Sequence, residues 1–301
     1  QPEENVILKI SQLREIFVVR WSVFLLGVAG CAKTTIWQTL LDAQNLNGEK
    51  STCATLNPKG VTRNELYGSI SMATREWKDG VLSQIFRDFS NATSHQHEWI
   101  VLDGDIDAEW IESMNTVMDD NKLLTLASNE RIPLTAPMRL LFEIGDLRNA
   151  SPATVSRAGV IFVNEDDIGW MPFVVTWLDK REDDNERSTL LKLVEKYVPP
   201  TLEAVKKIFK TTVPIVQINM VCTLCYLLDG LLGDGTHKAT LDENAIEATF
   251  VFASVWAFGG ALLADKSMDH RDAFSKWWVE EFKTIKFPEE GEVYDYRLEK
   301  T

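Results

Sequence analysis

The sequence predicts an α/β fold built on a parallel five-stranded sheet with inserted β-hairpins, followed by an α-helical unit. In the first half, short apolar runs alternate with segments of helical periodicity, the pattern of parallel strands joined by crossover helices. From about Gly169, apolar residues recur at three- and four-residue spacing in long segments. We therefore expect an α/β unit over residues 1–168 and a helical unit over residues 169–301.

The expected elements of the α/β unit begin with a helix that is already under way by Val6. Each expected strand is a short apolar run, and the five runs cover residues 22–27, 51–57, 98–103, 139–144 and 160–163. Helical periodicity lies between them at residues 33–46, 80–91, 109–118 and 153–158. Strands that alternate with helices in this way predict a doubly wound core, whose ligands bind at the carboxyl ends of the strands.

Two segments interrupt the alternation, residues 66–80 and 121–137. Both contain turn residues between short extended pieces, so we expect two inserted hairpins. Inserts of this kind usually contact other parts of a protein or its partners.

The helical half contains four amphipathic segments, residues 174–198, 214–232, 243–264 and 272–285. The acidic run at 181–186 is expected to be a hinge or a solvated helix start. Cys222 and Cys225 have the spacing of a redox or zinc motif, but they lie in an apolar run without a second pair. We interpret them as buried helix cysteines.

Composition narrows the possible partners. The chain has 301 residues and a formal net charge of −14, which argues against a nucleic-acid-binding surface. The apolar run at 250–264 is shorter than the roughly 20 residues that cross a bilayer, so no membrane span is expected. The chain starts at Gln1 with a helix already under way, which suggests an excerpt from a longer protein.

The stretch GVAGCAKTT, residues 27–35, is close to a phosphate-binding loop of the form G-x-x-x-x-G-K-[ST]. An apolar strand precedes it and a helix follows, so backbone N–H groups and the helix dipole would face an anion. Lys33 would reach the phosphates, and Thr34 would offer its hydroxyl to Mg²⁺. The expected nucleotide-binding residues are Gly27, Gly30, Ala32, Lys33, Thr34, Thr35 and Asp103.

Ala32 replaces the second glycine of the motif. If this residue has helical φ and ψ, alanine fits without strain and binding survives. Asp103 ends the strand WIVLD and is the expected second Mg²⁺ group, acting through water. The next position, where hydrolysing members of this broad class place a glutamate base, is Gly104. Asp105 could replace that base only through a shifted path.

Arg157 lies in a short helical segment before the last strand. It could pair with a carboxylate of its own fold, or it could project to the nucleotide of a neighbouring subunit as an arginine finger. The residues alone leave both readings open.

Several long strings carry a resemblance to a known family: NPKGVTRNELYG (57–68), TREWKDGVLS (74–83), the stretch 99–134 and ATVSRAGV (153–160). Together they resemble the second AAA+ module of a dynein heavy chain, and the details favour an axonemal chain over a cytoplasmic one. The resemblance implies an AAA+ large subdomain over 1–168, a helical lid over 169–301, and a site that holds ATP and Mg²⁺ with little turnover.

The resemblance also implies the partners. These are the adjacent AAA+ modules and the mechanical linker of the same heavy chain, other dynein subunits, and microtubules through the intact motor alone. Arg157 matches the position from which the second module reaches the first module's nucleotide, so its implied role is catalytic in trans. The hairpins around Trp77 and Arg131 match the inserts that approach the linker, although Trp77 could instead pack on its own domain.

Two features depart from the family pattern. Glu143 stands where AAA+ proteins often place a polar sensor, and a glutamate there would repel a γ-phosphate unless it is paired. Arg187 and Arg271 are available as a lid sensor arginine, and neither has a convincing context. Two alternatives therefore stay open: a module that hydrolyses ATP at its own site through Asp105 or Glu143, and a nucleotide-free scaffold.

Overall fold

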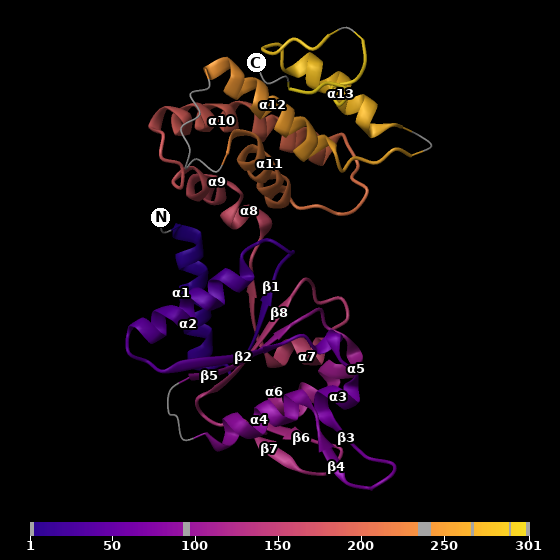
Figure 1. Ribbon diagram of the computed structural model, residues 1–301. Helices are drawn as coiled ribbons and strands as arrows, with labels where there is room; N and C mark the ends of the chain where they lie inside the picture. Colours follow the sequence, from indigo (N-terminus) through magenta and orange to yellow (C-terminus); the bar gives the residue numbers. More distant parts are fainter. Residues whose placement is uncertain (1–2, 93–96, 234–241, 266–267, 289, 299–301) are drawn as a thin grey trace. The chain divides into compact units, whose positions relative to one another are not determined.

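The computed structural model describes residues 3–92, 97–233, 242–265, 268–288 and 290–298. The chain divides into two compact units, residues 2–168 and residues 169–301, which are described separately below (Figure 1).

A five-stranded parallel sheet forms the centre of the first unit. Its strands are β1 (Ser22–Leu26), β2 (Ser51–Leu56), β5 (His97–Asp103), β8 (Met138–Ile144) and β9 (Gly159–Phe162), in the order β2-β5-β8-β1-β9. All five predicted strands are confirmed, each to within one residue at either end. β1 lies inside the sheet between the central strand β8 and the edge strand β9, so the loop that follows it leaves from the carboxyl edge beside β8.

Side chains alternate between the two faces of the sheet and bury both. One face, which includes Trp99, Val101 and Leu141, packs against α1 (Glu4–Val19) and α2 (Lys33–Leu46). Figure 1 shows these two helices on one side of the sheet and α3, α5 and α7 on the other. At the carboxyl edge, Asp103 and Glu143 are register partners on neighbouring strands. Their side chains therefore continue the same face, just past its last apolar residues.

The remaining helices of the first unit are short. They are η1 (Pro58–Gly60), α3 (Arg63–Tyr67), α4 (Val81–Asn91), α5 (Ala108–Ile111), η2 (Glu112–Met114), α6 (Asn115–Met118), α7 (Pro152–Arg157) and, near the end of the unit, α8 (Glu165–Ile168). The helix expected at 109–118 is thus split into three pieces. The split falls at Met114, whose ψ of −10° opens the turn, while the N–H of Asn115 bonds to the carbonyl of Glu112 in 3₁₀ fashion.

Both predicted hairpins are confirmed. β3 (Gly68–Ile70) pairs with β4 (Trp77–Asp79), and β6 (Leu123–Thr125) pairs with β7 (Arg131–Pro133), in each case antiparallel. The Trp77 ring lies over Gly68 and packs against the core of its own unit. Gly68 has φ +104°, a conformation that L side chains rarely adopt, and a β-carbon there would lie 2.4 Å from the ring.

Arg87 of α4 joins the two hairpins. Its guanidinium donates to Asp79 Oδ1 of the first hairpin at 2.8 Å and to Glu130 Oε1 in the turn of the second. All three side chains are partly exposed, so each ion pair contributes on the order of 0–1 kcal/mol. Their structural effect is to link two segments that are separated by more than a helix in the sequence.

The second unit is helical. Its helices are α9 (Met171–Leu178), α10 (Asp184–Lys207), α11 (Gln217–Leu232), α12 (Glu243–Gly259) and α13 (His270–Glu281). Asp183 accepts from the N–H groups of Asn185 and Glu186 and caps α10, so the acidic run contains a helix start, one of the two expected readings. Cys225 is buried in α11 and Cys222 is half-buried. Among the described helices none is long and apolar enough to cross a membrane.

Candidate nucleotide site

Two glycines shape the loop between β1 and α2. Gly27 donates its N–H to the carbonyl of Ile144, and a β-carbon on Gly27 would lie 2.3 Å from the carbonyl oxygen of Val163. The first glycine is therefore required by close approach to the end of β9. Gly30 has φ +83° and allows the chain to curl, as predicted.

Ala32 has φ +68° and ψ +24°, which is the left-handed region, and it forms the N-cap of α2. The condition for a strain-free alanine, helical φ and ψ, is therefore not met. An L-residue in this conformation costs roughly 1–2 kcal/mol, because its β-carbon approaches the following carbonyl oxygen. The loop keeps the conformation that the motif's glycine would adopt, and alanine bears the strain.

Lys33 is buried and folded onto its own loop. Its ammonium donates to the carbonyl oxygens of Gly27 at 2.7 Å and Val28 at 2.9 Å. The loop thus holds the positively charged Lys33 ammonium near the N-terminus of α2. The exposed Thr34 and Thr35 follow it. To reach a phosphate, Lys33 would have to exchange these two carbonyl partners for phosphate oxygens.

Thr34 and Glu143 meet across 109 residues of sequence. The Thr34 hydroxyl donates to Glu143 Oε1 at 2.6 Å, and the Trp37 indole N–H donates to Glu143 Oε2 at 2.9 Å. Glu143 is 7% exposed, so a buried carboxylate has a donor on each oxygen. Both donors are neutral groups, so they satisfy the hydrogen bonds of the carboxylate without cancelling its charge. Sequence reasoning missed Trp37, although Thr34 and Trp37 are three residues apart and share one helix face.

Asp103 is exposed at the end of β5, beside Glu143. Gly104 follows it, and the carboxylate of Asp105 accepts the N–H of Gly145 at 3.1 Å, in the chain beyond β8. Asp105 is therefore engaged at the end of the neighbouring strand. Position 104 itself carries no side chain that could take a proton.

Arg157 ends α7, and its Nε donates to Asp119 Oδ1. The arginine is thus paired with a carboxylate of its own fold, the first of the two readings. α7 is fixed by its Ser151 cap, and Thr154 donates to Asn115 Oδ1 at 3.1 Å. The Arg157 side chain is 28% exposed, so it lies partly at the surface.

The two candidate lid arginines lie in the second unit. Arg187 pairs with Asp184 in the first turn of α10, and Arg271 lies over the Tyr294 ring at 4.7 Å from its centroid. Each therefore has a partner within its own unit.

The donor set at the carboxyl edge fits a magnesium ion held together with a nucleotide. Thr34, Asp103 and Glu143 offer one hydroxyl and two carboxylates, the oxygen ligands that Mg²⁺ prefers. Across the described residues, no three His, Cys, Asp or Glu side chains converge as a dedicated metal cluster. Mg²⁺ usually binds through one or two carboxylates plus substrate phosphates and water, rather than through such a cluster.

Each of the two units matches a dynein-related family of AAA domains. Residues 22–158 match the AAA domain of the dynein-related subfamily, and residues 190–301 match the dynein heavy chain AAA lid domain. The first unit is therefore an AAA domain, a nucleotide-binding fold of the P-loop class, and the second contains its lid. The predicted fold is confirmed.

Curated relatives narrow the class to a family. Over 99% of its length the chain is 58% identical to the dynein beta chain, flagellar outer arm, of Chlamydomonas reinhardtii. Over the same share it is 52% identical to the ciliary dynein beta chain of Tripneustes gratilla and 49% identical to dynein axonemal heavy chain 9 of Homo sapiens. The chain belongs to the dynein heavy chain family. It spans 7% of the length of each of these relatives.

Proposed function

We propose that this chain is the second AAA+ module of an axonemal dynein heavy chain and that it holds ATP and Mg²⁺ with little or no hydrolysis at its own site. One observation carries the proposal. A phosphate-type loop, Thr34 and Asp103 are assembled at the sheet edge, while the base position is Gly104 and the nearby Asp105 is bonded to Gly145.

In this proposal the N–H groups of the loop and Lys33 hold the phosphates, and Thr34 and Asp103 hold the cation, Asp103 through water. When bound, the cation would neutralise part of the phosphate charge. Bound nucleotide then persists, because no side chain at position 104 activates water.

We further propose that Arg157 acts in trans on the nucleotide of the preceding module. Its bond to Asp119 uses Nε, lies at a partly exposed position, and contributes on the order of 0–1 kcal/mol. Exchange of this carboxylate for a phosphate is therefore inexpensive. Asp119 would hold the guanidinium ready at the surface until the neighbouring nucleotide is in place.

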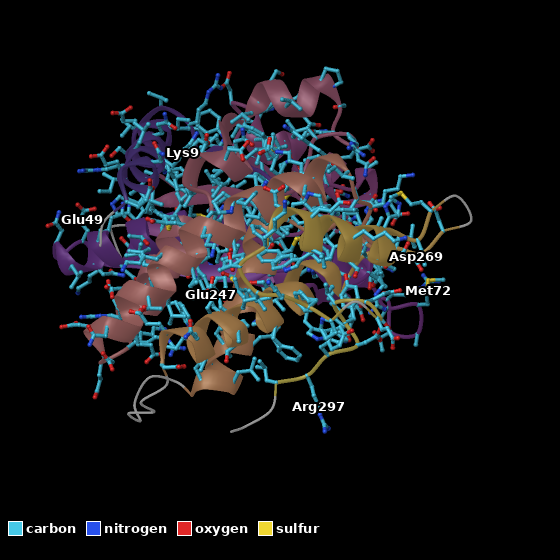
Figure 2. The ribbon with its side chains drawn as sticks, turned by 90° about the horizontal axis from the view of Figure 1, so that it is seen from above. Lys9, Glu49, Met72, Glu247, Asp269 and Arg297 are labelled. Atoms are coloured by element: carbon cyan, nitrogen blue, oxygen red, sulfur yellow. The ribbon has the colours of Figure 1, made fainter. Side chains whose placement is uncertain are left out.

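The hairpins are proposed to contact the linker. In the first hairpin, Ile70 is 51% exposed and Met72, in the turn between β3 and β4, is 96% exposed. Figure 2 labels Met72 on that turn. Trp77 faces the core, so we assign the apolar contact surface of the first hairpin to Ile70 and Met72. On the second hairpin we assign the contact to the exposed Arg131.

The names of the relatives support placement in a ciliary or flagellar axoneme. Microtubule binding is proposed to belong to the intact heavy chain, outside this segment, and other dynein subunits are proposed as partners within the complex. The cytoplasm is the alternative location.

The test uses the intact heavy chain with Arg157→Ala and, as a matched control, Arg148→Ala, an exposed arginine of the same unit. The first change should lower motor ATPase by about 10³-fold or more while this module stays occupied, since an arginine finger contributes 10³–10⁵ to turnover. Unchanged ATPase in Arg157→Ala would exclude the trans role. Absence of nucleotide retained at this module, with the fold intact, would favour the scaffold alternative.

A further inference from the structure

We infer that Glu143 is a positioning residue of the divalent-cation site: by holding the Thr34 hydroxyl and adding its charge beside Asp103, it makes nucleotide binding here strongly dependent on Mg²⁺. The inference rests on the nucleotide-binding function proposed above. It gives a defined task to a carboxylate that stands where a neutral sensor would be expected.

The first support is the hydrogen-bond geometry. A hydroxyl has one hydrogen and two acceptor lone pairs, and Thr34 gives its hydrogen to Glu143 Oε1 at 2.6 Å. Both lone pairs of Thr34 are then left for a cation. Without this acceptor the hydroxyl could turn its hydrogen toward the cation, which is the unfavourable orientation.

The second support is that Glu143 is fixed. Its other oxygen accepts from Trp37 at 2.9 Å, and both donors come from α2, the helix that begins at the loop. A 7% exposed carboxylate held at two points has little freedom to rotate. This favours a positioning role.

The third support is the distribution of charge. Glu143 and Asp103 are register partners on adjacent parallel strands, which lie about 4.8 Å apart, and both side chains are on the face covered by α2. Lys33, the cation of the loop, donates to the carbonyls of Gly27 and Val28. Two neighbouring carboxylates beside a phosphate site attract a divalent cation and repel a phosphate that arrives without one.

The experiment measures Mn²⁺ as a spectroscopic substitute for Mg²⁺ on the full chain. ATP binding is followed by calorimetry and bound Mn²⁺ by electron paramagnetic resonance, in the wild type, Glu143→Gln and Glu98→Gln. Glu98 is the matched control, a 2% exposed carboxylate at the opposite end of β5. In Glu143→Gln the Mn²⁺ concentration for half-saturation with ATP should rise 10–100-fold, the usual effect of removing a group that orients a metal ligand. ATP affinity in chelator should stay the same or increase, and Glu98→Gln should behave as wild type.

A Thr34→Val background separates positioning from general structural support. If Glu143 acts in part through Thr34, the shift caused by Glu143→Gln should be smaller in that background, because only the contribution of its charge remains. A general loss of structure would leave the shift unchanged. Equal Mn²⁺ midpoints in wild type and Glu143→Gln, with ATP binding intact, would overturn the inference and leave the proposed function standing. A chain that binds no ATP at any Mn²⁺ concentration would overturn both.

Discussion

Replacing Gly104 with glutamate puts a carboxylate back at the position after Asp103. If the missing base is the reason that ATP persists, this single change should convert bound ATP to ADP. The neighbourhood of Gly104 determines what else the change does. A β-carbon there would lie 2.9 Å from Asn57 Oδ1 and 3.3 Å from Pro58 Cδ. Gly104 does not have a left-handed φ, so no backbone strain is added.

The steric effect can be estimated from the contacts of Asn57. Its Oδ1 accepts the N–H of Lys59 at 2.9 Å and caps η1, so displacement of the side chain costs about 0.5–2 kcal/mol, the usual value of an N-cap. This cost should be nearly the same for Gly104→Ala, Gly104→Gln and Gly104→Glu. Differences in hydrolysis between the last two then belong to the carboxylate, whose contribution as a general base is about 10²–10⁴-fold.

The assay counts ATP and ADP retained by the intact heavy chain after free nucleotide is removed, over a time course, for wild type and the three variants. We expect ATP to persist in wild type, Ala and Gln, and ADP to appear in Glu at least about 10²-fold faster. Urea unfolding of the same proteins should place the three variants about 1 kcal/mol below wild type. Equal retention of ATP in the Glu and Gln variants, with both folded, would refute the reasoning that Gly104 silences the site.

Three further predictions concern single features. Ala32→Gly should raise the unfolding free energy by about 0.5–1 kcal/mol in urea, because relief of roughly 1–2 kcal/mol of left-handed strain outweighs the added freedom of glycine in the unfolded chain; a loss of stability would contradict this. Arg87→Ala should cost about 2 kcal/mol or less and should speed amide hydrogen exchange in both hairpins; faster exchange in one hairpin alone would show that they are not coupled. Burial raises the pKa of Cys225 to about 12, above the ordinary thiol value of 9.0, so at pH 8 the folded chain should be alkylated at Cys222 well before Cys225, as peptide mass spectrometry can measure. Alkylation of Cys225 at the rate of an unfolded control would contradict that burial.

The fold was predictable because its signals are local. Each strand is a short apolar run, and its ends are marked by residues such as Asp103 or by the loop glycines, so the boundaries agree with the structure to within a residue. The helix at 109–118 was predicted as one piece because periodicity does not detect a turn that opens at Met114. The break depends on the backbone angles of one residue in its tertiary setting.

The residues of the candidate site that follow from local sequence were predictable, and the hydrogen bonds between distant residues were not. The loop, Lys33 and Asp103 follow from a strand, a glycine-bearing turn and a helix in sequence. The bond between Thr34 and Glu143 joins residues 109 positions apart and depends on the order of strands in the sheet. The angles of Ala32 were left open for a different reason: alanine favours a helix, and the loop around it overrides that preference.

Arg87 connects the two hairpins, so a force on one hairpin is transmitted to the other. One guanidinium connects them, so a load applied at the turn that contains Met72 is shared with the second hairpin through Asp79, Arg87 and Glu130. The pair resists bending together while both bonds hold. Because each bond is weak and partly exposed, an overload would break the connection before it unfolded a strand, and the same bonds would reform when the load is removed. In a module that contacts a moving linker, as proposed above, the connection would break and re-form without unfolding of either hairpin.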